Sequence, residues 1–317
     1  MSLIHLVKRK FVVRNLILVL ALFIVLASSS FLSVSAFGIA SPQPAISPLK
    51  GGYPKTLTSP HPQSNGEFGY SVAISGKLAI VGAWLETAGG YSEAGHAYIY
   101  NATTWKLIQN LTSPNAQDYG YFGISISISG NFAMVGAPGE TASGFYSDGD
   151  AYVFNAITGK VIQSLTSPNQ VDDGVFGWSV AISAKLAIVG APGETSTGGL
   201  WAGNVYVYNI ATGKLIKTLT SPNSQEGGYF GSSVSITGKL VIIGAPDESV
   251  GELYYAGNAY IFNAVTGKVI QSLSSPNAQD WGLFGSSVAI IGKLAIVGAP
   301  WETPDGYAEA GHAYAFK

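Results

Sequence analysis

The sequence predicts an all-β protein, a five-bladed β-propeller of four-stranded blades, and two observations carry that prediction. First, one pattern recurs five times at a spacing of 54 residues without insertions, with Phe-Gly pairs that start at residues 68, 122, 176, 230 and 284. Second, 40 glycines and 12% aromatic residues in a chain of 317 are typical of many short strands joined by tight turns. A repeat of this length that encodes four strands indicates one propeller blade.

The first copy shows the four expected strands in order. Residues 71–74 alternate small and branched side chains, and after a tight Gly-Lys turn residues 78–81 form a continuous apolar run, which predicts a hairpin with a buried second strand. A loop of about 14 residues leads to a third strand at residues 97–100. Residues 107–111 are the fourth strand, and a Ser-Pro pair ends it because proline cannot donate to the ladder.

Other residues recur at fixed positions in all five copies, which implies one supersecondary unit used five times. A Gly-Ala pair begins at residues 82, 136, 190, 244 and 298. Four single positions also recur: a serine (Ser71, Ser125, Ser179, Ser233, Ser287), a glutamate (Glu86, Glu140, Glu194, Glu248, Glu302), a glycine (Gly95, Gly149, Gly203, Gly257, Gly311) and a tyrosine (Tyr98, Tyr152, Tyr206, Tyr260, Tyr314).

The two ends of the repeat region predict how the ring closes. Residues 55–60 match the fourth strand and its Ser-Pro stop, as residues 217–222 do, whereas the last copy ends after its third strand. We therefore expect the N-terminal strand to supply the outer strand of the fifth blade, so that the ring closes without a free edge. The predicted propeller covers residues 55–317, and the Pro-, Gly- and Ser-rich residues 41–54 are a linker.

Residues 1–40 have the layout of an export signal. Four basic residues precede an aliphatic run at residues 16–27, and small residues follow up to Ala36 and Ala40, the two expected cleavage sites. The alternative is an uncleaved N-terminal membrane anchor, although the run is shorter than the ~20 residues that span a bilayer. Both readings place the propeller outside the cytoplasm, secreted or at the cell surface.

Composition excludes several classes of function. Without cysteine there is no disulfide framework, thiolate zinc site or cysteine nucleophile. The whole chain has a net charge of −2, and residues 41–317 keep 12 lysines against 18 acidic residues, a net charge of −6. Such a surface repels phosphate backbones, so nucleic acid is not an expected partner.

The run Phe-Gly-x-Ser-Val followed by Val-Gly-Ala-Pro resembles the FG-GAP repeat, known from the head propeller of integrin α subunits, and its fuller form is similar to the prokaryotic variety on exported proteins. The resemblance covers residues 55–317, and copy one departs from it at Trp84, where the other copies have proline. Integrin repeats often carry an Asp-rich calcium loop between the first two strands. Here that turn is short and has no acid, as in residues 75–77, so the family's calcium site is absent.

A meander puts its 1–2 and 3–4 turns on one side and its 2–3 and 4–1 loops on the other. All 18 acids fall in the expected long loops, whereas eight lysines fall in the short turns. The long loops also carry many aromatic residues, which make strong contacts at protein interfaces. We select as candidate ligand-binding residues Trp84, Tyr119, Tyr146, Trp201, Tyr229, Tyr255, Trp281 and Trp301. The alternative for any one of these rings is that it only covers loop backbone.

The recurrent glutamates allow two interpretations. The favoured one is structural: each carboxylate accepts backbone N–H bonds that hold its loop. A polar residue ten positions later, just before the third strand (His96, Asp150, Asn204, Asn258, His312), then caps the loop. The alternative is a cation site, calcium included, whose candidate ligands are Glu86, Glu140, Glu194, Glu248, Glu302, His96, Asp150 and His312.

The sequence favours binding over catalysis. Propeller glycosidases need carboxylates in different environments, which five near-identical copies do not offer, and no nucleophilic triad or phosphate loop is evident. Two sequons, at Asn101 and Asn110, are candidate glycosylation sites.

We therefore expect an adhesion or surface-interaction module that recognises a protein through the acidic, aromatic loops. A multivalent lectin and a purely structural envelope protein are the alternatives. Membrane contact is expected only through an uncleaved N-terminal segment.

Overall fold

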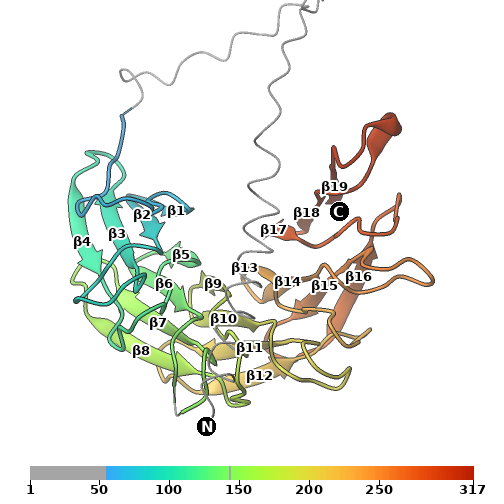
Figure 1. Ribbon diagram of the computed structural model, residues 1–317, viewed down its shortest axis with the longest axis horizontal. Coiled ribbons are helices and arrows are strands. Elements are labelled where there is room, and N and C mark those ends of the chain that lie inside the picture. The colour runs from blue at the N-terminus through green and yellow to red at the C-terminus, as the bar shows by residue number, and fades with distance from the viewer. Residues whose placement is uncertain (1–54, 143) are drawn as a thin grey trace, which may run out of the picture. The chain divides into compact units, whose positions relative to one another are not determined.

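The structure, a computed structural model, describes residues 55–317 except residue 143. The expected export segment and linker, residues 1–54, lie outside the described residues. Residues 57–317 form one compact unit. Within it five antiparallel sheets follow one another in chain order, as Figure 1 shows. No helix in the described part of the chain is long and apolar enough to cross a membrane.

The first four sheets are four-stranded meanders, as predicted. Sheet one consists of β1 (Ser71–Ser75), β2 (Leu78–Ala83), β3 (His96–Asn101) and β4 (Leu107–Leu111). Sheet two contains β5 (Ile126–Ser129), β6 (Phe132–Ala137), β7 (Asp150–Asn155) and β8 (Val161–Thr166). Sheet three contains β9 (Ser179–Ser183), β10 (Leu186–Ala191), β11 (Asn204–Asn209) and β12 (Leu215–Leu219). Sheet four contains β13 (Ser233–Thr237), β14 (Leu240–Ala245), β15 (Asn258–Asn263) and β16 (Val269–Ser274).

Sheet five has three strands, β17 (Ser287–Ile291), β18 (Leu294–Ala299) and β19 (His312–Phe316). Residues 55–58 carry no strand, so their pairing with β19 is not observed in the structure. The five-bladed all-β architecture is confirmed, whereas closure of the ring by the N-terminal strand stays a prediction. A 3₁₀ turn, η2 (Pro304–Gly306), replaces the small loop bridge of copy four, Val250 with Leu253, because Pro304 has no N–H to donate.

The first strands of neighbouring sheets pack side by side, β1 with β5, β5 with β9, β9 with β13, and β13 with β17. In the first four sheets the second and third strands are buried on both faces, as in β2, where all six residues are buried, whereas β18 and β19 of sheet five alternate buried or half-buried with exposed residues. Between sheets one and two, Ile80 and Ile99 pack with Phe122 and Tyr152 in one apolar cluster. The phenylalanines of the second to fifth Phe-Gly pairs are therefore inter-sheet core residues, whereas Phe68 of the first pair is half-buried.

The recurrent Phe-Gly, Ser and Gly-Ala residues build the joint between one sheet and the next. In the first joint the Ser71 hydroxyl donates to the carbonyl of Gly123, 2.7 Å away. Gly82 lies against the same carbonyl, and a Cβ there would overlap it. Three further joints repeat this bond at 2.7 Å, from Ser125 to Gly177, Ser179 to Gly231 and Ser233 to Gly285. The recurrent motif therefore joins consecutive copies through a serine hydrogen bond and a close glycine contact.

Candidate functional site

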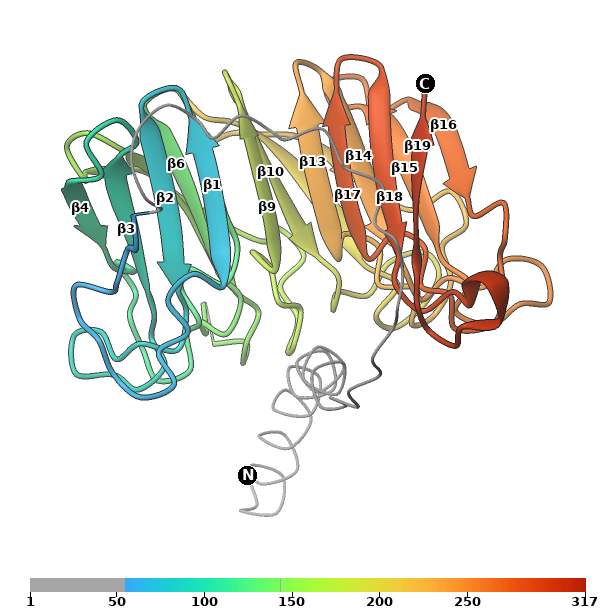
Figure 2. The same cartoon turned by 90° about the horizontal axis from the view of Figure 1, so that it is seen from above.

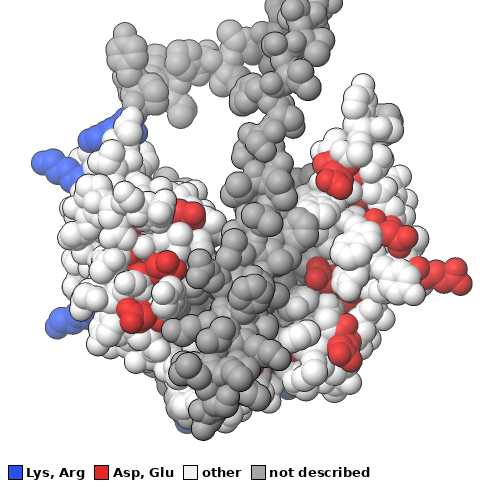
Figure 3. Space-filling view, in the orientation of Figure 1, with Lys and Arg blue, Asp and Glu red and all other residues white. Residues whose placement is uncertain are grey.

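Charge separates the two sides of the row of sheets as the sequence predicts. We call the side with the 2–3 and 4–1 loops the loop face, and the opposite side the turn side. Figure 3 shows acidic side chains spread over one face of the molecule, with basic ones at its margin. The eight turn lysines lie between strands one and two or three and four of their sheets. One detail differs from expectation: Asp150 is the first residue of β7 rather than a loop residue.

On the loop face, loops of neighbouring sheets pair by backbone hydrogen bonds. The Tyr119 N–H donates to the Ser92 carbonyl and the Phe122 N–H to that of Ala94, so the loop before β5 runs alongside the loop after β2. The Asp118 carboxylate accepts the Ser92 N–H at 2.8 Å, and Asp172 and Asp280 do the same for later joints. Some of the acidic side chains on the loop face therefore stabilise the loops, because their carboxylates accept backbone N–H groups of the neighbouring loop.

These paired loops hold aromatic residues in an unfavourable backbone conformation. Trp201, Tyr229, Tyr255 and Trp281 all have positive φ, from 50° to 64°, and so does Tyr119. Left-handed backbone disfavours bulky side chains, and residues held there cluster at functional sites. Gly227 occupies the place in copy four that corresponds to Trp281, so glycine suits this position. The matching positions of the other copies also have positive φ whichever side chain they carry, as Asp173 and Leu283 do, so this conformation belongs to the repeat.

Four of these rings form a strip across two joints. The rings of Tyr255 and Trp281 lie 4.4 Å apart between centroids, and those of Trp201 and Tyr229 stack at 6.5 Å with 9° between planes. Burial raises the pKa of Tyr229 to about 12, and Asp247 and the hydroxyl of Tyr255 contribute to the rise. Tyr229 of one ring pair therefore lies close enough to Tyr255 of the other pair to interact with it electrostatically. Burial also raises the pKa of Asp247 to about 7. We call these four residues the aromatic strip; Trp281 is 55% exposed.

The structure places seven of the eight candidate ligand residues at the surface. Trp201, Tyr119 and Trp281 are exposed, and the other four, Tyr146, Tyr229, Tyr255 and Trp301, are half-buried. Trp84 is a correction, because it is only 4% exposed. Its indole N–H donates to Glu67 at 2.7 Å and its ring packs against Tyr70 and Tyr121. It fills the joint and offers no contact surface.

Each recurrent glutamate is buried, but its partners differ from those expected. The bonds come from side chains rather than from backbone N–H groups. In sheet three the Glu194 carboxylate accepts hydrogen bonds from Ser167, Tyr206 and Asn204. Ser167 precedes the sheet and Tyr206 belongs to β11, so each carboxylate ties the end of one blade to the next. Burial raises the pKa of Glu194 and Glu248, while these donors oppose that shift.

Sheet two carries a different version of this cluster. Asp150 stands where sheet three has Asn204, and the Tyr152 hydroxyl donates to both Glu140 and Asp150. Burial raises the pKa of Glu140 to about 9 against the opposing hydrogen bonds from Ser113 and Tyr152, and the nearby Asp150 carboxyl adds a smaller contribution to the rise. Asp148, also buried, accepts the Ala142 N–H, and burial raises its pKa to about 6. Glu140 is therefore protonated at neutral pH.

The first and last copies pair the glutamate with histidine, as the spacing predicts. His96 Nδ1 lies 3.2 Å from Glu86 Oε2, and His312 Nδ1 lies 2.8 Å from Glu302 Oε2. Burial and the stacked ring of His61 lower the pKa of His96 to about 4, so it is neutral at physiological pH. The described residues contain no group of three or more His, Asp or Glu side chains arranged to hold a metal ion. The cation site stays a prediction.

Comparison with known families decides the identity of the repeat. The FG-GAP repeat family matches the chain five times, over residues 55–100, 105–154, 161–208, 215–262 and 270–316. The chain belongs to the FG-GAP repeat family. The expected resemblance is thereby confirmed over the part that the structure describes.

Solved structures similar to this FG-GAP protein include two computationally designed proteins. Ika8 is 14% identical with a TM-score of 0.48, over 77% of this chain and 57% of Ika8. The chain thus spans little more than half the length of Ika8. Ika4 is 14% identical with a TM-score of 0.41, over 65% of this chain and 95% of Ika4. Comparison with curated proteins gives no significant match.

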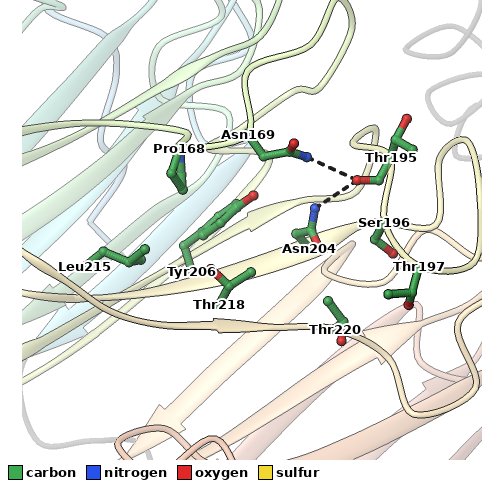
Figure 4. A pocket seen from close by; sticks show the side chains of 10 residues that line it. All are labelled: Pro168, Asn169, Thr195, Ser196, Thr197, Asn204, Tyr206, Leu215, Thr218 and Thr220. Atoms are coloured by element: carbon green, nitrogen blue, oxygen red, sulfur yellow. Dashed lines mark hydrogen bonds between the residues drawn. The ribbon is translucent and has the colours of Figure 1, made fainter.

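The third FG-GAP copy also borders a shallow groove of about 390 Å³ (Figure 4). Its lining is rich in hydroxyl and amide groups and has no charged side chain: Pro168, Asn169, Thr195, Ser196, Thr197, Asn204, Tyr206, Leu215, Thr218 and Thr220. The amides of Asn169 and Asn204 both donate to the Thr195 carbonyl. The sequence analysis missed this groove: Asn204 and Tyr206 were evident as recurrent positions, but the packing that brings them beside residues 195–197 and 215–220 has no local pattern.

The two sequons differ in their surroundings. The Asn101 side chain accepts the N–H groups of Thr103 and Thr104 and so shapes the turn between β3 and β4. Asn110 is exposed in β4, the outer strand of sheet one. Glycosylation at either position stays a prediction.

Proposed function

We propose that this FG-GAP protein is a non-catalytic binding module that recognises a macromolecular partner, a protein, through the aromatic strip of its loop face. The observation that carries the proposal is the strip itself: four large rings gathered from three copies, in backbone conformations that glycine would suit better. Tyr and Trp dominate contact energies at protein interfaces, and Trp201 and Trp281 expose their rings on the loop face.

The negative charge of the loop face indicates which kind of partner it would bind. Acidic side chains are spread over the loop face, and the turn lysines lie on the turn side. A partner with basic side chains would gain Coulomb attraction and cation–π contacts with the rings. The uneven distribution of aromatic residues among the copies, with Trp281 and Gly227 at corresponding places, favours one asymmetric partner over five equal sites.

Location outside the cytoplasm is part of the proposal. It rests on the basic and aliphatic pattern of residues 1–40 and on the exported members of the family that the chain resembles. An adhesion or surface-interaction role follows from that location together with the strip.

A carbohydrate ligand is the second candidate, and the groove beside copy three favours it. Hydroxyl and amide groups together with the apolar side chains of Pro168 and Leu215 suit the polar edge and apolar face of a sugar ring. The groove lies beside the loop that leads to Trp201, so one glycan could contact both.

The two candidates are separated by probing the full chain with two materials. One is an extract of envelope proteins from the producing cells, before and after protease digestion, and the other is a glycan array with calcium or with EDTA. Retention of a protein that protease treatment abolishes, with no array signal, supports the proposal. An array signal without protein retention moves the assignment to a lectin, and its loss in EDTA would support the cation site.

A further inference from the structure

One acidic side chain on the loop face lacks the partners that its neighbours have. Asp118, Asp172 and Asp280 each accept an N–H of the neighbouring loop. The recurrent glutamates accept hydrogen bonds from serine, tyrosine or asparagine side chains. The half-buried Asp247 carboxylate accepts no hydrogen bond and forms no ion pair within the part of the chain that the structure describes. A carboxylate that leaves water without a partner is costly, and a cation beside it would offset that cost.

Copy four alone carries an acid at this position. The residue directly before the recurrent glutamate is Leu85, Gly139, Gly193 or Trp301 in the other copies. The packing around it is visible in copy two, where a Cβ added to Gly139 would lie 2.6 Å from Cδ2 of Tyr121. Tyr121 corresponds to Tyr229 in copy four, and Asp247 contributes to the raised pKa of Tyr229. The Asp247 carboxyl therefore lies beside Tyr229.

Through Tyr229 this carboxyl belongs to the aromatic strip. The Tyr229 hydroxyl interacts with both Asp247 and Tyr255, and Tyr255 follows Asp247 in the same loop between β14 and β15. Each tyrosine is paired with an exposed tryptophan, Tyr229 with Trp201 and Tyr255 with Trp281. One unpaired carboxylate, two hydroxyls and two exposed indole rings therefore share one region of the loop face.

We propose that Asp247 and the aromatic strip form a site for one cationic side chain of the protein partner, a lysine or an arginine. The carboxylate supplies the opposite charge and a charge-assisted hydrogen bond. The rings supply cation–π contacts and cover the alkyl stem of the incoming side chain, while the tyrosine hydroxyls accept further N–H groups. This inference rests on the proposed function, because it names the group that the strip recognises.

Other occupants suit this site less well. The eight turn lysines lie on the turn side, and Figure 2 shows the short turns and the long loops along opposite edges of the row of sheets, so these lysines do not reach Asp247. Calcium takes six to eight oxygen ligands, far more than one carboxylate supplies. An anionic group would be repelled. A cationic side chain needs only the single carboxylate and the rings that are present.

The test is an NMR titration of the isotope-labelled full chain with three small probes, the Nα-acetyl amides of lysine, arginine and norleucine. Norleucine has an alkyl side chain without the charge. We expect the lysine or the arginine amide to shift the indole N–H signals of Trp201 and Trp281 saturably, and the norleucine amide to leave them in place. Shifts as large with norleucine, or no shift with any of the three probes, would overturn the proposal.

Variants assign the charge recognition to one residue. Asp247→Asn removes the charge with little change of shape and should weaken binding of the cationic amide at least about tenfold. Asp247→Gly, the residue of copies two and three, should do the same, and melting curves check that both variants are folded. Glu226→Gln is the matched control, because it removes an exposed charge from the loop that carries Tyr229. An equal loss in Glu226→Gln would overturn the proposal, since general surface charge would then attract the probe.

Cell-surface binding separates this inference from the proposed function. The two fail differently. If Trp201→Ala/Trp281→Ala loses binding to the producing cells while Asp247→Asn binds as the wild type does, the proposed function stands and the Asp247 site is overturned. If the cationic amide binds in an Asp247-dependent manner while the double tryptophan variant still binds cells, the Asp247 site is supported and the proposed function is overturned.

Discussion

At the scale of single residues, a buried glutamate recurs in all five copies, and the residue ten positions later influences its pKa. Asn204 donates to Glu194, whereas Asp150 adds a second carboxyl beside Glu140 and contributes to its raised pKa. A native pKa above the unfolded value means that the folded chain holds a proton that the unfolded chain has lost. Glu140 therefore lowers stability increasingly as the pH rises from about 4.5 to about 9.

Because Glu140 faces a carboxyl and Glu194 faces an amide donor, we expect Glu→Gln to have opposite effects on stability at these two positions. Glu140→Gln removes the need to hold a proton and lets an amide donate to Asp150, so it should raise the free energy of unfolding at pH 8 by about 1–3 kcal/mol. The gain should shrink towards pH 5. Glu194→Gln turns an amide towards the donor Asn204 and should lower the free energy of unfolding by about 1–3 kcal/mol. Urea unfolding at both pH values measures this, and equal effects of the two substitutions would refute the account.

Two tryptophans test the division between core and surface. Trp84→Ala should lower the free energy of unfolding by about 3–5 kcal/mol, because it empties a buried joint. Trp281→Gly should change it by no more than about 1 kcal/mol, since relief of the positive φ offsets the lost ring contact with Tyr255. Thermal unfolding of both variants measures these changes. A large decrease in the stability of Trp281→Gly would show that the Trp281 ring has a structural role.

The sequence located the residues of the buried clusters but not their contacts. Glu194 and Tyr206 were both evident as recurrent positions. Their hydrogen bond was not, because it links a loop to a strand of the same blade while Ser167 joins them from the blade before. Trp84 was misplaced for a related reason: a loop position predicts exposure, and only the packing of Tyr70 and Tyr121 shows that the ring is covered.

At the scale of elements, the strands were predictable and the loops were not. Alternating and continuous apolar runs gave four strands per copy, with ends within two residues of those observed, as for β2 and β3. The loop pairing between neighbouring sheets, such as Tyr119 with Ser92, depends on how the sheets dock and has no local pattern. The positive φ values of the aromatic strip follow from that pairing, so the sequence predicted the residues but not their strain.

The close packing at the joint between sheets allows us to predict the effect of replacing its glycine with alanine. Gly190→Ala forces a Cβ into the carbonyl of Gly231 and should lower the free energy of unfolding by about 1–3 kcal/mol or more. Gly298→Ala is the matched control, since only the movable Ser287 side chain lies near it. Melting temperatures of the two variants test this, and an equal loss would show that the joint carbonyl does not set the need for glycine.

At the scale of the whole molecule, the row of sheets depends on the segment before β1. Leu57 covers apolar residues of sheet one, and Ser59 satisfies Glu86. Deleting residues 55–61 from the full chain should therefore lower the melting temperature markedly, because it uncovers apolar residues of sheet one such as Val81 and leaves a buried carboxylate short of a donor. An unchanged melting curve would contradict this role of the segment before β1.

The central claim is that the aromatic strip of the loop face binds the partner. The most direct test measures binding of the labelled full chain to the surface of the cells that produce it, for the wild type, Trp201→Ala/Trp281→Ala and Trp105→Ala. Trp105 is the matched control, since it also has positive φ but lies in a turn on the opposite side. The account predicts a loss of at least tenfold in affinity for the strip variant alone, equivalent to about 1.4 kcal/mol. Equal binding by all three proteins would contradict it.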